Sequence, residues 1–263
     1  MNIRMVFLGT GTCHATSRNP SSLALSNGEE LILVDAGGGA YHQLARIGNP
    51  FFDYRNISTV FLTHFHVDHV SGLPDLIWGE MWGLQQRERP LTLVGPKGLK
   101  HFYEDRLLPF IGDYTLPFPV MLRELAPDET VPGTFYTACS YPLHHGECST
   151  GYLFKFSDGA LAVTGDTGYC ENLLTLLRRA DIAVMEWSMP GGGSVPEHLS
   201  TDDVMRILKA GAFPQQVYAQ HLYLLPGEDF EARVELNRRT LGAEAKRFTF
   251  PKDGDVVDLT FLL

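Results

Sequence analysis

Apolar residues in this chain form short runs that alternate with longer amphipathic stretches. The short runs predict strands near residues 3–8, 23–25, 31–34, 60–63, 91–94, 135–139, 152–156, 161–164, 182–185, 217–220, 248–250 and 256–261. Helical spacing predicts helices near residues 41–47, 74–86, 98–110, 171–179, 201–210 and 229–241. Strands come in runs, and the helices fall between the runs. The pattern therefore predicts one α/β or α+β domain over residues 1–263, with sheets covered by helices.

The composition is that of a globular protein with a sizeable core. The chain has 263 residues, of which 44% are hydrophobic and 20% are charged. No stretch approaches the roughly 18 apolar residues of a membrane span, and the apolar part of the start is too short for a signal peptide. We therefore expect a cytoplasmic protein with no membrane partner. The formal net charge of −10 disfavours a broad nucleic-acid surface, although bound divalent cations would add local positive charge.

The cysteines do not indicate a cross-linked or thiolate-bound protein. Cys13, Cys139, Cys148 and Cys170 are scattered and form no Cys-x-x-Cys pair. We expect reduced thiols rather than a disulfide framework or a thiolate zinc site.

The strongest chemical signal is the segment Thr-His-Phe-His-Val-Asp-His at residues 63–69. His64 and His66 are two residues apart, so on an extended chain both imidazoles point to one face and can bind one cation. Asp68 and His69 lie on the turn that follows and are displaced enough to serve a second cation. Neutral imidazole nitrogen and carboxylate oxygen are ligands that zinc accepts. The segment predicts a metal site; the alternative is a histidine-rich surface turn.

Further candidate ligands stand at the ends of later predicted strands. His144 and His145 follow Tyr-Pro-Leu, Asp166 lies in Thr-Gly-Asp-Thr-Gly, and His221 follows Val-Tyr-Ala-Gln. Each alone could be a capped or solvated residue. Together they suit a binuclear centre, because an aspartate between two cations can bridge them and offset their charge.

These segments resemble a known family. His64-Phe-His66-Val-Asp68-His69 matches the signature of the metallo-β-lactamase fold. The chain is similar to the ribonuclease Z-like and phosphodiesterase branch in Leu8-Gly-Thr-Gly-Thr, Arg18-Asn-Pro-Ser-Ser, Asp68-His-Val-Ser-Gly-Leu-Pro, the spacing of His145 to Gly151-Tyr152, and Thr164-Gly-Asp166-Thr. The resemblance implies a four-layer αββα sandwich of two mixed β-sheets flanked by helices, with a dimetal site at one edge between the sheets.

The resemblance also implies how the ligands divide between the metals. One zinc would be held by His64, His66 and His145, and the other by Asp68, His69 and His221, with Asp166 bridging. The spacing to Gly151-Tyr152 selects His145 over His144, which is left a supporting or packing role. Zinc is expected, although mixed nitrogen and oxygen ligation also suits manganese or iron. Members of the branch often dimerise, so the resemblance is compatible with a homodimer.

A second motif concerns the reacting group. Glu197-His198-Leu-Ser-Thr201 resembles the family's His-Ser-Thr helix start, with an extra Leu199. In that family the histidine lies near the reacting phosphate, so His198 is expected to stabilise the phosphorane or to protonate the leaving oxygen. The alternative is a histidine that caps or packs at a helix entrance. Residues 190–196 predict either a mobile loop over the site or a simple connector.

The expected reaction is hydrolysis by a binuclear centre. Two cations about 3.5–4 Å apart would hold a bridging hydroxide that attacks an ester, with Asp68 both ligating and relaying the proton. The branch resemblance favours phosphodiester hydrolysis of a small diester or a cyclic nucleotide.

Ribonuclease Z, the tRNA 3′-processing endonuclease, is the main alternative. The bacterial enzymes that the chain resembles carry a tRNA-binding arm between the segments that match Gly151-Tyr152 and Asp166. Here that interval reads as a hairpin with a Ser-Asp-Gly turn and has no room for an arm. A small-molecule phosphoester is therefore preferred and nucleic acid is disfavoured. A glyoxalase II-like thioesterase and a non-catalytic metal-binding module are weaker alternatives, the latter because every expected ligand is present.

Overall fold

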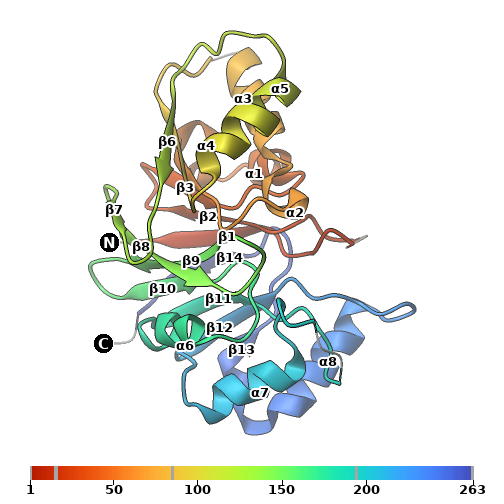
Figure 1. Cartoon of the computed structure of the whole chain (residues 1–263). Helices are drawn as coiled ribbons and strands as arrows, with labels where there is room; N and C mark the ends of the chain where they lie inside the picture. Colours follow the sequence, from red (N-terminus) through yellow and green to blue (C-terminus); the bar gives the residue numbers. More distant parts are fainter. Residues whose placement is uncertain (1, 15–16, 84–85, 193–194, 262–263) are drawn as a thin grey trace. The chain divides into compact units, whose positions relative to one another are not determined.

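The computed structural model describes residues 2–14, 17–83, 86–192 and 195–261 and divides the chain into two compact units (Figure 1). Unit 1 comprises Met1–Gly9, Asn19–Ala126 and Asp253–Leu259, and unit 2 comprises Thr10–Arg18, Pro127–Lys252 and Thr260–Leu263. Each unit contains one seven-stranded mixed sheet with helices against it. The prediction of two mixed sheets flanked by helices is confirmed. A single domain over residues 1–263 stays a prediction.

The sheet of unit 1 has the strand order β14-β1-β2-β3-β4-β5-β6. Its strands are β1 (Arg4–Gly9), β2 (Ser22–Ser26), β3 (Leu31–Val34), β4 (Ile57–Phe61), β5 (Leu91–Gly95), β6 (Val120–Glu124) and β14 (Val256–Asp258). β1 pairs antiparallel with β14 and β2, and β2 pairs antiparallel with β3. From β3 to β6 the pairing is parallel. The carboxyl ends of β3, β4 and β5 therefore meet at one edge, which is where parallel sheets place functional loops.

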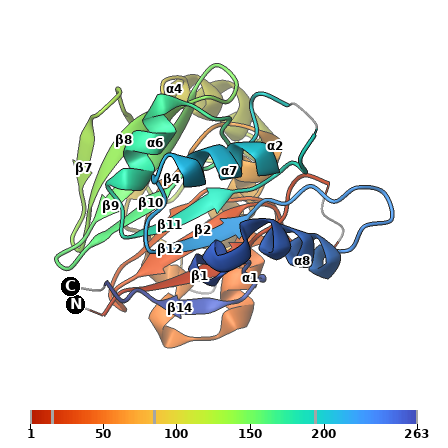
Figure 2. The ribbon, with the colours of Figure 1, turned by 90° about the horizontal axis from the view of Figure 1, so that it is seen from below.

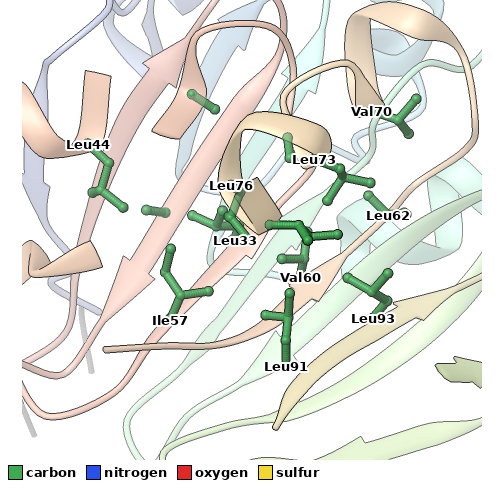
Figure 3. Packing of buried hydrophobic residues seen from close by; sticks show 14 of the residues in the cluster. Leu33, Leu44, Ile57, Val60, Leu62, Val70, Leu73, Leu76, Leu91 and Leu93 are labelled. Carbon is green, nitrogen blue, oxygen red and sulfur yellow. The ribbon is translucent and has the colours of Figure 1, made fainter. Parts of the chain in front are cut away.

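The helices of unit 1 pack on its sheet through aliphatic side chains. They are α1 (Ala40–Ile47), α2 (Val67–Val70), α3 (Leu73–Trp82), α4 (Leu99–Phe102) and α5 (Leu108–Ile111), with shorter turns η1 (Pro50–Phe52), η2 (Tyr54–Asn56) and the π-helical η3 (Tyr103–Leu107). Figure 3 shows Leu33, Val60 and Leu93 of the sheet in one cluster with Leu73 and Leu76 of α3. These side chains are at most 1% exposed, so each contributes roughly 1.5–3 kcal/mol by burial.

The sheet of unit 2 has the strand order β13-β12-β11-β10-β9-β8-β7. Its strands are β7 (Thr130–Pro132), β8 (Thr137–Leu143), β9 (Ser149–Lys155), β10 (Ala160–Val163), β11 (Ile182–Glu186), β12 (Gln216–Gln220) and β13 (Phe248–Thr249). β7, β8, β9 and β10 pair antiparallel in turn, and β10, β11, β12 and β13 pair parallel. The carboxyl ends of β10, β11 and β12 therefore share one edge of this sheet.

Three α-helices cover one face of the unit 2 sheet, as Figures 1 and 2 both show. They are α6 (Glu171–Arg178), α7 (Thr201–Lys209) and α8 (Phe230–Leu241), followed by the 3-10 helix η4 (Gly242–Arg247). Ser200 caps α7 in a reciprocal capping box with Asp203, which fixes the start of this helix at Thr201. None of the helices among the described residues is long and apolar enough to cross a membrane.

Some boundaries differ from those expected. The predicted helix at residues 98–110 is three segments, α4, η3 and α5, and Pro109 stands in the first turn of α5, where its missing N–H is tolerated. The predicted helix at residues 74–86 ends at Trp82, because Gly83 is extended; residues 84–85 of that prediction lie outside the described residues. Two strands, β6 and β7, were not predicted.

Gly9, at the end of β1, is required by a close backbone approach. A Cβ atom at this position would lie 1.8 Å from the carbonyl oxygen of Pro20 and 2.8 Å from that of Asn19. We expect Gly9→Ala to lower the free energy of unfolding by about 3 kcal/mol, because backbone atoms must shift. Urea denaturation of the metal-free protein measures this loss of unfolding free energy. Gly95→Ala is the control, since its Cβ would meet only Leu99 at 3.5 Å; equal losses in the two variants would contradict the prediction.

Candidate metal centre

The carboxyl end of β4 carries a cluster of histidines in unit 1. We call His64, His66, Asp68 and His69 the first donor set. The ring of His64 lies 4.6 Å from that of His66 and 4.2 Å from that of His69, between centroids. His69 Nε2 is 3.9 Å from Asp68 Oδ2. His64, Asp68 and His69 are buried and His66 is exposed, so three of the four donors are withdrawn from bulk water.

Asp35, directly after β3, orients the first donor set. Its carboxylate contacts His69 Nδ1 at 2.7 Å and accepts hydrogen bonds from the Thr63 N–H at 2.8 Å and the Thr63 hydroxyl at 2.9 Å. With Nδ1 engaged, His69 presents Nε2 as its ligand atom, which is the usual arrangement around protein-bound metals. Asp35 has a φ of 58°, a conformation that costs of order 1–3 kcal/mol and that clusters at functional sites.

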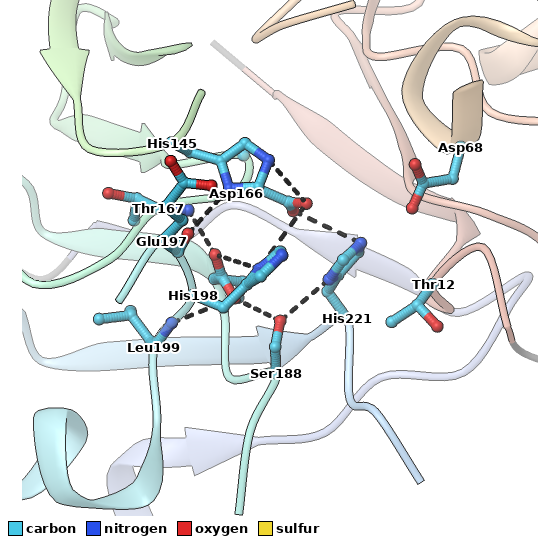
Figure 4. Close-up of polar contacts among 12 residues, drawn as sticks. Thr12, Asp68, His145, Asp166, Thr167, Ser188, Glu197, His198, Leu199 and His221 are labelled. Carbon is cyan, nitrogen blue, oxygen red and sulfur yellow. Dashed lines mark hydrogen bonds and ion pairs between the residues drawn. The ribbon is translucent and has the colours of Figure 1, made fainter. Parts of the chain in front are cut away.

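Unit 2 carries a second cluster at the carboxyl ends of β10 and β12 (Figure 4). We call His145, Asp166, His198 and His221 the second donor set. Asp166 lies among three imidazoles. One carboxylate oxygen, Oδ2, is 3.9 Å from His145 Nε2 and 3.9 Å from His198 Nδ1, and the other, Oδ1, is 3.4 Å from His221 Nε2. His145, Asp166 and His198 each offer a ligand atom within 4.8 Å of the others.

The histidines of the second donor set are held by their Nδ1 atoms. His145 Nδ1 contacts the backbone oxygen of Glu197 at 2.8 Å, and His221 Nδ1 contacts the Ser188 hydroxyl at 3.0 Å. Both rings therefore turn Nε2 toward Asp166. His221 has a φ of 59°, and its N–H donates to the Thr10 carbonyl at 2.9 Å, which holds this unfavourable conformation.

Glu186, the last residue of β11, organises His198. It accepts hydrogen bonds from the Thr167 N–H, the Ser188 hydroxyl and, at 3.3 Å, the Leu199 N–H. His198 Nδ1 lies 3.1 Å from Oε2 and 3.3 Å from Oε1 of the same carboxylate. Burial raises the pKa of Glu186, the hydrogen bond with His198 lowers it, and the charge of Asp166 raises it again. His198 is thus held near Asp166 by a buried carboxylate.

Two neighbouring residues differ sharply in their surroundings. His145 is buried beside Asp166, whereas His144 is exposed and its backbone N–H donates to the Thr167 hydroxyl at 3.3 Å.

Of the predicted loop at residues 190–196, residues 193–194 lie outside the described part of the chain. Gly192 N–H donates to Asp202 Oδ2 at 3.1 Å. A covering role for the loop stays a prediction.

Asp35 and Glu186 are the two residues of these clusters that sequence reasoning missed. Asp35 directly follows the apolar run Leu31–Val34, and Glu186 directly follows the apolar run Ile182–Met185. Asp166 stands in a similar place, three residues after the strand Ala160–Val163. A carboxylate at the end of a buried strand is therefore the signal that would have found them.

A comparison with family models matches residues 30–222 to the family described as Beta-lactamase superfamily domain. Among curated proteins, Ribonuclease Z of Methanosarcina mazei is 35% identical over 151 residues, which cover 57% of this chain and 47% of that protein. The chain thus spans about half the length of the curated relatives that it matches.

Solved structures are similar over nearly the whole chain. The metallo-beta-lactamase fold protein YhfI from Bacillus subtilis has a TM-score of 0.75 at 18% identity, with 98% of this chain and 100% of that one covered. Unliganded PDE1 from yeast has a TM-score of 0.75 at 17% identity, with 98% and 99% covered. At such low identity these likenesses show the fold.

Proposed function

We propose that this chain, which belongs to the beta-lactamase superfamily, is a phosphodiesterase that depends on two divalent metal ions. The observation that carries the proposal is the second donor set, in which imidazole nitrogens surround one buried carboxylate. His145 and His221 are fixed through Nδ1 and direct Nε2 toward Asp166, as metal-binding histidines do. The first donor set offers the same chemistry, with His69 fixed by Asp35. Imidazole nitrogens together with carboxylate oxygens fit zinc.

The ligands divide as the family resemblance implies. We assign one ion to His64, His66 and His145, and the other to Asp68, His69 and His221, with Asp166 shared. When bound, two such ions lower the pKa of water and stabilise charge on phosphoryl oxygens. Zinc is the first choice, and manganese or iron would suit the same mixture of nitrogen and oxygen donors.

The protein's own groups orient the ligands and move protons. Asp35, Ser188 and the Glu197 carbonyl fix three imidazoles, so little reorganisation is needed when ions or substrate bind. Asp68 is the proposed acceptor of the proton from the attacking water. His198 faces Glu186 with Nδ1, which leaves Nε2 to carry a proton to the leaving oxygen.

A small phosphodiester is the preferred substrate. β9 ends at Lys155 and β10 begins at Ala160, and Phe156 N–H donates to the Gly159 carbonyl at 2.8 Å. This tight hairpin fills the interval in which the bacterial ribonuclease Z enzymes that the chain resembles carry a tRNA-binding arm. The net charge of −10 also disfavours a polyanionic substrate.

Ribonuclease Z is the second candidate, and the curated relatives favour it. The match at 35% identity is to proteins of that name, although it covers only about half of each. Cleavage of a nucleic-acid substrate is therefore tested beside hydrolysis of a model diester. The cytoplasmic location and the homodimer stay predictions.

Hydrolysis of bis-p-nitrophenyl phosphate by the zinc- or manganese-loaded protein tests the proposal. We expect turnover that a chelator abolishes and that added metal restores. No turnover with either metal in excess would overturn the phosphodiesterase assignment, and cleavage of a glutathione thioester instead would indicate a thioesterase. Removal of the 3′ trailer of a precursor tRNA, faster than hydrolysis of the model diester, would establish the second candidate.

Glu186→Gln tests the arrangement of His198. The amide keeps the shape of the side chain but must turn an NH₂ group toward one of its present donors, so His198 loses its fixed position. We expect kcat for bis-p-nitrophenyl phosphate to fall about 10–100-fold. The control is Glu235→Gln, on the exposed side of α8, where the carboxylate pairs with Arg239. A Glu186→Gln enzyme with the control's kcat would contradict a role for this carboxylate.

A further inference from the structure

Unit 2 contains a cavity of about 540 Å³ whose function is unassigned. Its lining includes His144, Tyr169, Pro196, Asp202 and Arg206. The volume falls in the range of roughly 300–1,000 Å³ that is typical of small-molecule sites. It is therefore large enough for a heterocyclic ring and its sugar.

The wall of this cavity is built from chain neighbours of the second donor set. His144 precedes His145, Tyr169 follows Asp166 by three residues, and Pro196 precedes Glu197, whose carbonyl holds His145. These segments are in close contact, because a Cβ on Gly168 would lie 1.8 Å from the Pro196 carbonyl oxygen. The cavity wall and the second donor set are therefore carried by the same segments of unit 2.

One side of the cavity presents a flat, cationic surface. The guanidinium carbon of Arg206 lies 3.7 Å from the centroid of the Tyr169 ring. Arg206 also donates to Asp203 Oδ1 at 2.8 Å, so its charge is compensated and its plane is fixed. The Arg206 side chain is 57% exposed, which leaves a planar face for another ring to stack on.

Asp202 supplies a carboxylate acceptor to the cavity, which the His144 imidazole and Tyr169 also line. The carboxylate of Asp203 is used by the capping box with Ser200 and by Arg206. Asp202 accepts one hydrogen bond through Oδ2, from Gly192 N–H, and within the described residues Oδ1 has no hydrogen-bond donor. The cavity therefore offers a carboxylate acceptor, and Asp202 is its one uncompensated charge. Such a site favours an amino group and disfavours a carbonyl oxygen or a phosphate at this position.

We propose that the cavity binds the base of a nucleotide ester, and that it selects bases with an exocyclic amino group (adenine, cytosine or guanine). The base stacks on the Arg206–Tyr169 pair, and its amino group donates to Asp202. Uracil and thymine carry a carbonyl oxygen in place of that amino group, so they lose this hydrogen bond and bind more weakly. The inference rests on the proposed function, since it takes the phosphodiester to be that of a nucleotide.

Equilibrium binding tests the site without relying on turnover. Calorimetric titration of the zinc-loaded protein with adenosine 5′-monophosphate and with uridine 5′-monophosphate compares two bases on the same phosphate. We expect the adenine nucleotide to bind about tenfold more tightly. Asp202→Asn should remove most of that preference, and Arg206→Ala should weaken both nucleotides about tenfold through lost stacking. Circular dichroism confirms that each variant is folded.

Arg239→Ala is the matched control, because Arg239, like Arg206, is an exposed helical arginine paired with a carboxylate on the preceding turn of its own helix. It should bind both nucleotides like the unmodified protein. Equal affinity for the two nucleotides, or an Arg206→Ala variant that binds like the control, would overturn the cavity assignment.

The same experiments separate this inference from the proposed function. Turnover of bis-p-nitrophenyl phosphate without any preference between the nucleotides overturns the base site and leaves the phosphodiesterase intact. A preference in binding that Asp202→Asn removes, without turnover of any diester, supports the base site and contradicts the phosphodiesterase.

Discussion

Replacing His66 by alanine should remove one metal ion and nearly all of the hydrolysis together. His66 is the exposed member of the first donor set, so its loss leaves little empty space in the core and should not unfold the protein. Its ring lies 4.6 Å from that of His64, and we assign both rings to one ion. We expect turnover of bis-p-nitrophenyl phosphate to fall by at least about 100-fold, since even residues behind a ligand cost 10–100-fold. Elemental analysis of the purified protein should show about one metal ion fewer per chain.

His101→Ala is the control for that experiment. His101 is likewise exposed and lies in unit 1, where its ring pairs with Asp105 at 2.5 Å. It should keep the metal content and the turnover of the unmodified protein. A His66→Ala protein that matched this control in both measurements would show that the assignment of His66 as a ligand is wrong.

Asp35→Asn should weaken both metal binding and the fold. The carboxylate of Asp35 faces three donors, the Thr63 N–H, the Thr63 hydroxyl and His69 Nδ1. The asparagine amide must direct its NH₂ group toward at least one of them, which leaves buried donors facing each other. We expect the zinc affinity to fall about 10–100-fold. The free energy of unfolding of the metal-free protein should fall by about 2–3 kcal/mol, as measured by urea denaturation in the presence of a chelator.

Asp75→Asn provides the comparison. Asp75 is 52% exposed in the first turn of α3, and its contact with His42 is a distant 3.9 Å. Its replacement should change the unfolding free energy by no more than about 0.5 kcal/mol. If the two variants lost the same stability, the network around Asp35 would contribute nothing specific to the fold.

The residues that the sequence could predict are those whose signal is local. The apolar runs of β3, β4, β10 and β11 are buried throughout or nearly so, and their composition identifies them without tertiary information. Donors crowded into residues 64–69 point to a metal through their chemistry alone. The strand β6 was missed because its residues are half-buried or exposed, so it lacks the continuous apolar run of a central strand.

What the sequence could not predict depends on partners far along the chain. Asp35 acquires its role from His69, and Glu186 from His198 and Thr167. Their position at the end of an apolar strand marks both carboxylates as candidates, but the sequence does not show which side chains they contact. The sequence also does not show that His144 is exposed while His145 is buried, because the path of the backbone after β8 decides this.

The short turn between β9 and β10 has a consequence for how new specificities can arise on this scaffold. Ser157 and Asp158 are exposed at its tip, and the strands on either side are anchored by their own pairing. Lengthening such a loop costs little, about 0.6 kcal/mol for each doubling of its length. Chain inserted there would leave every proposed ligand in place. Recognition of larger substrates can therefore be gained or lost at this point while the hydrolytic chemistry is inherited unchanged.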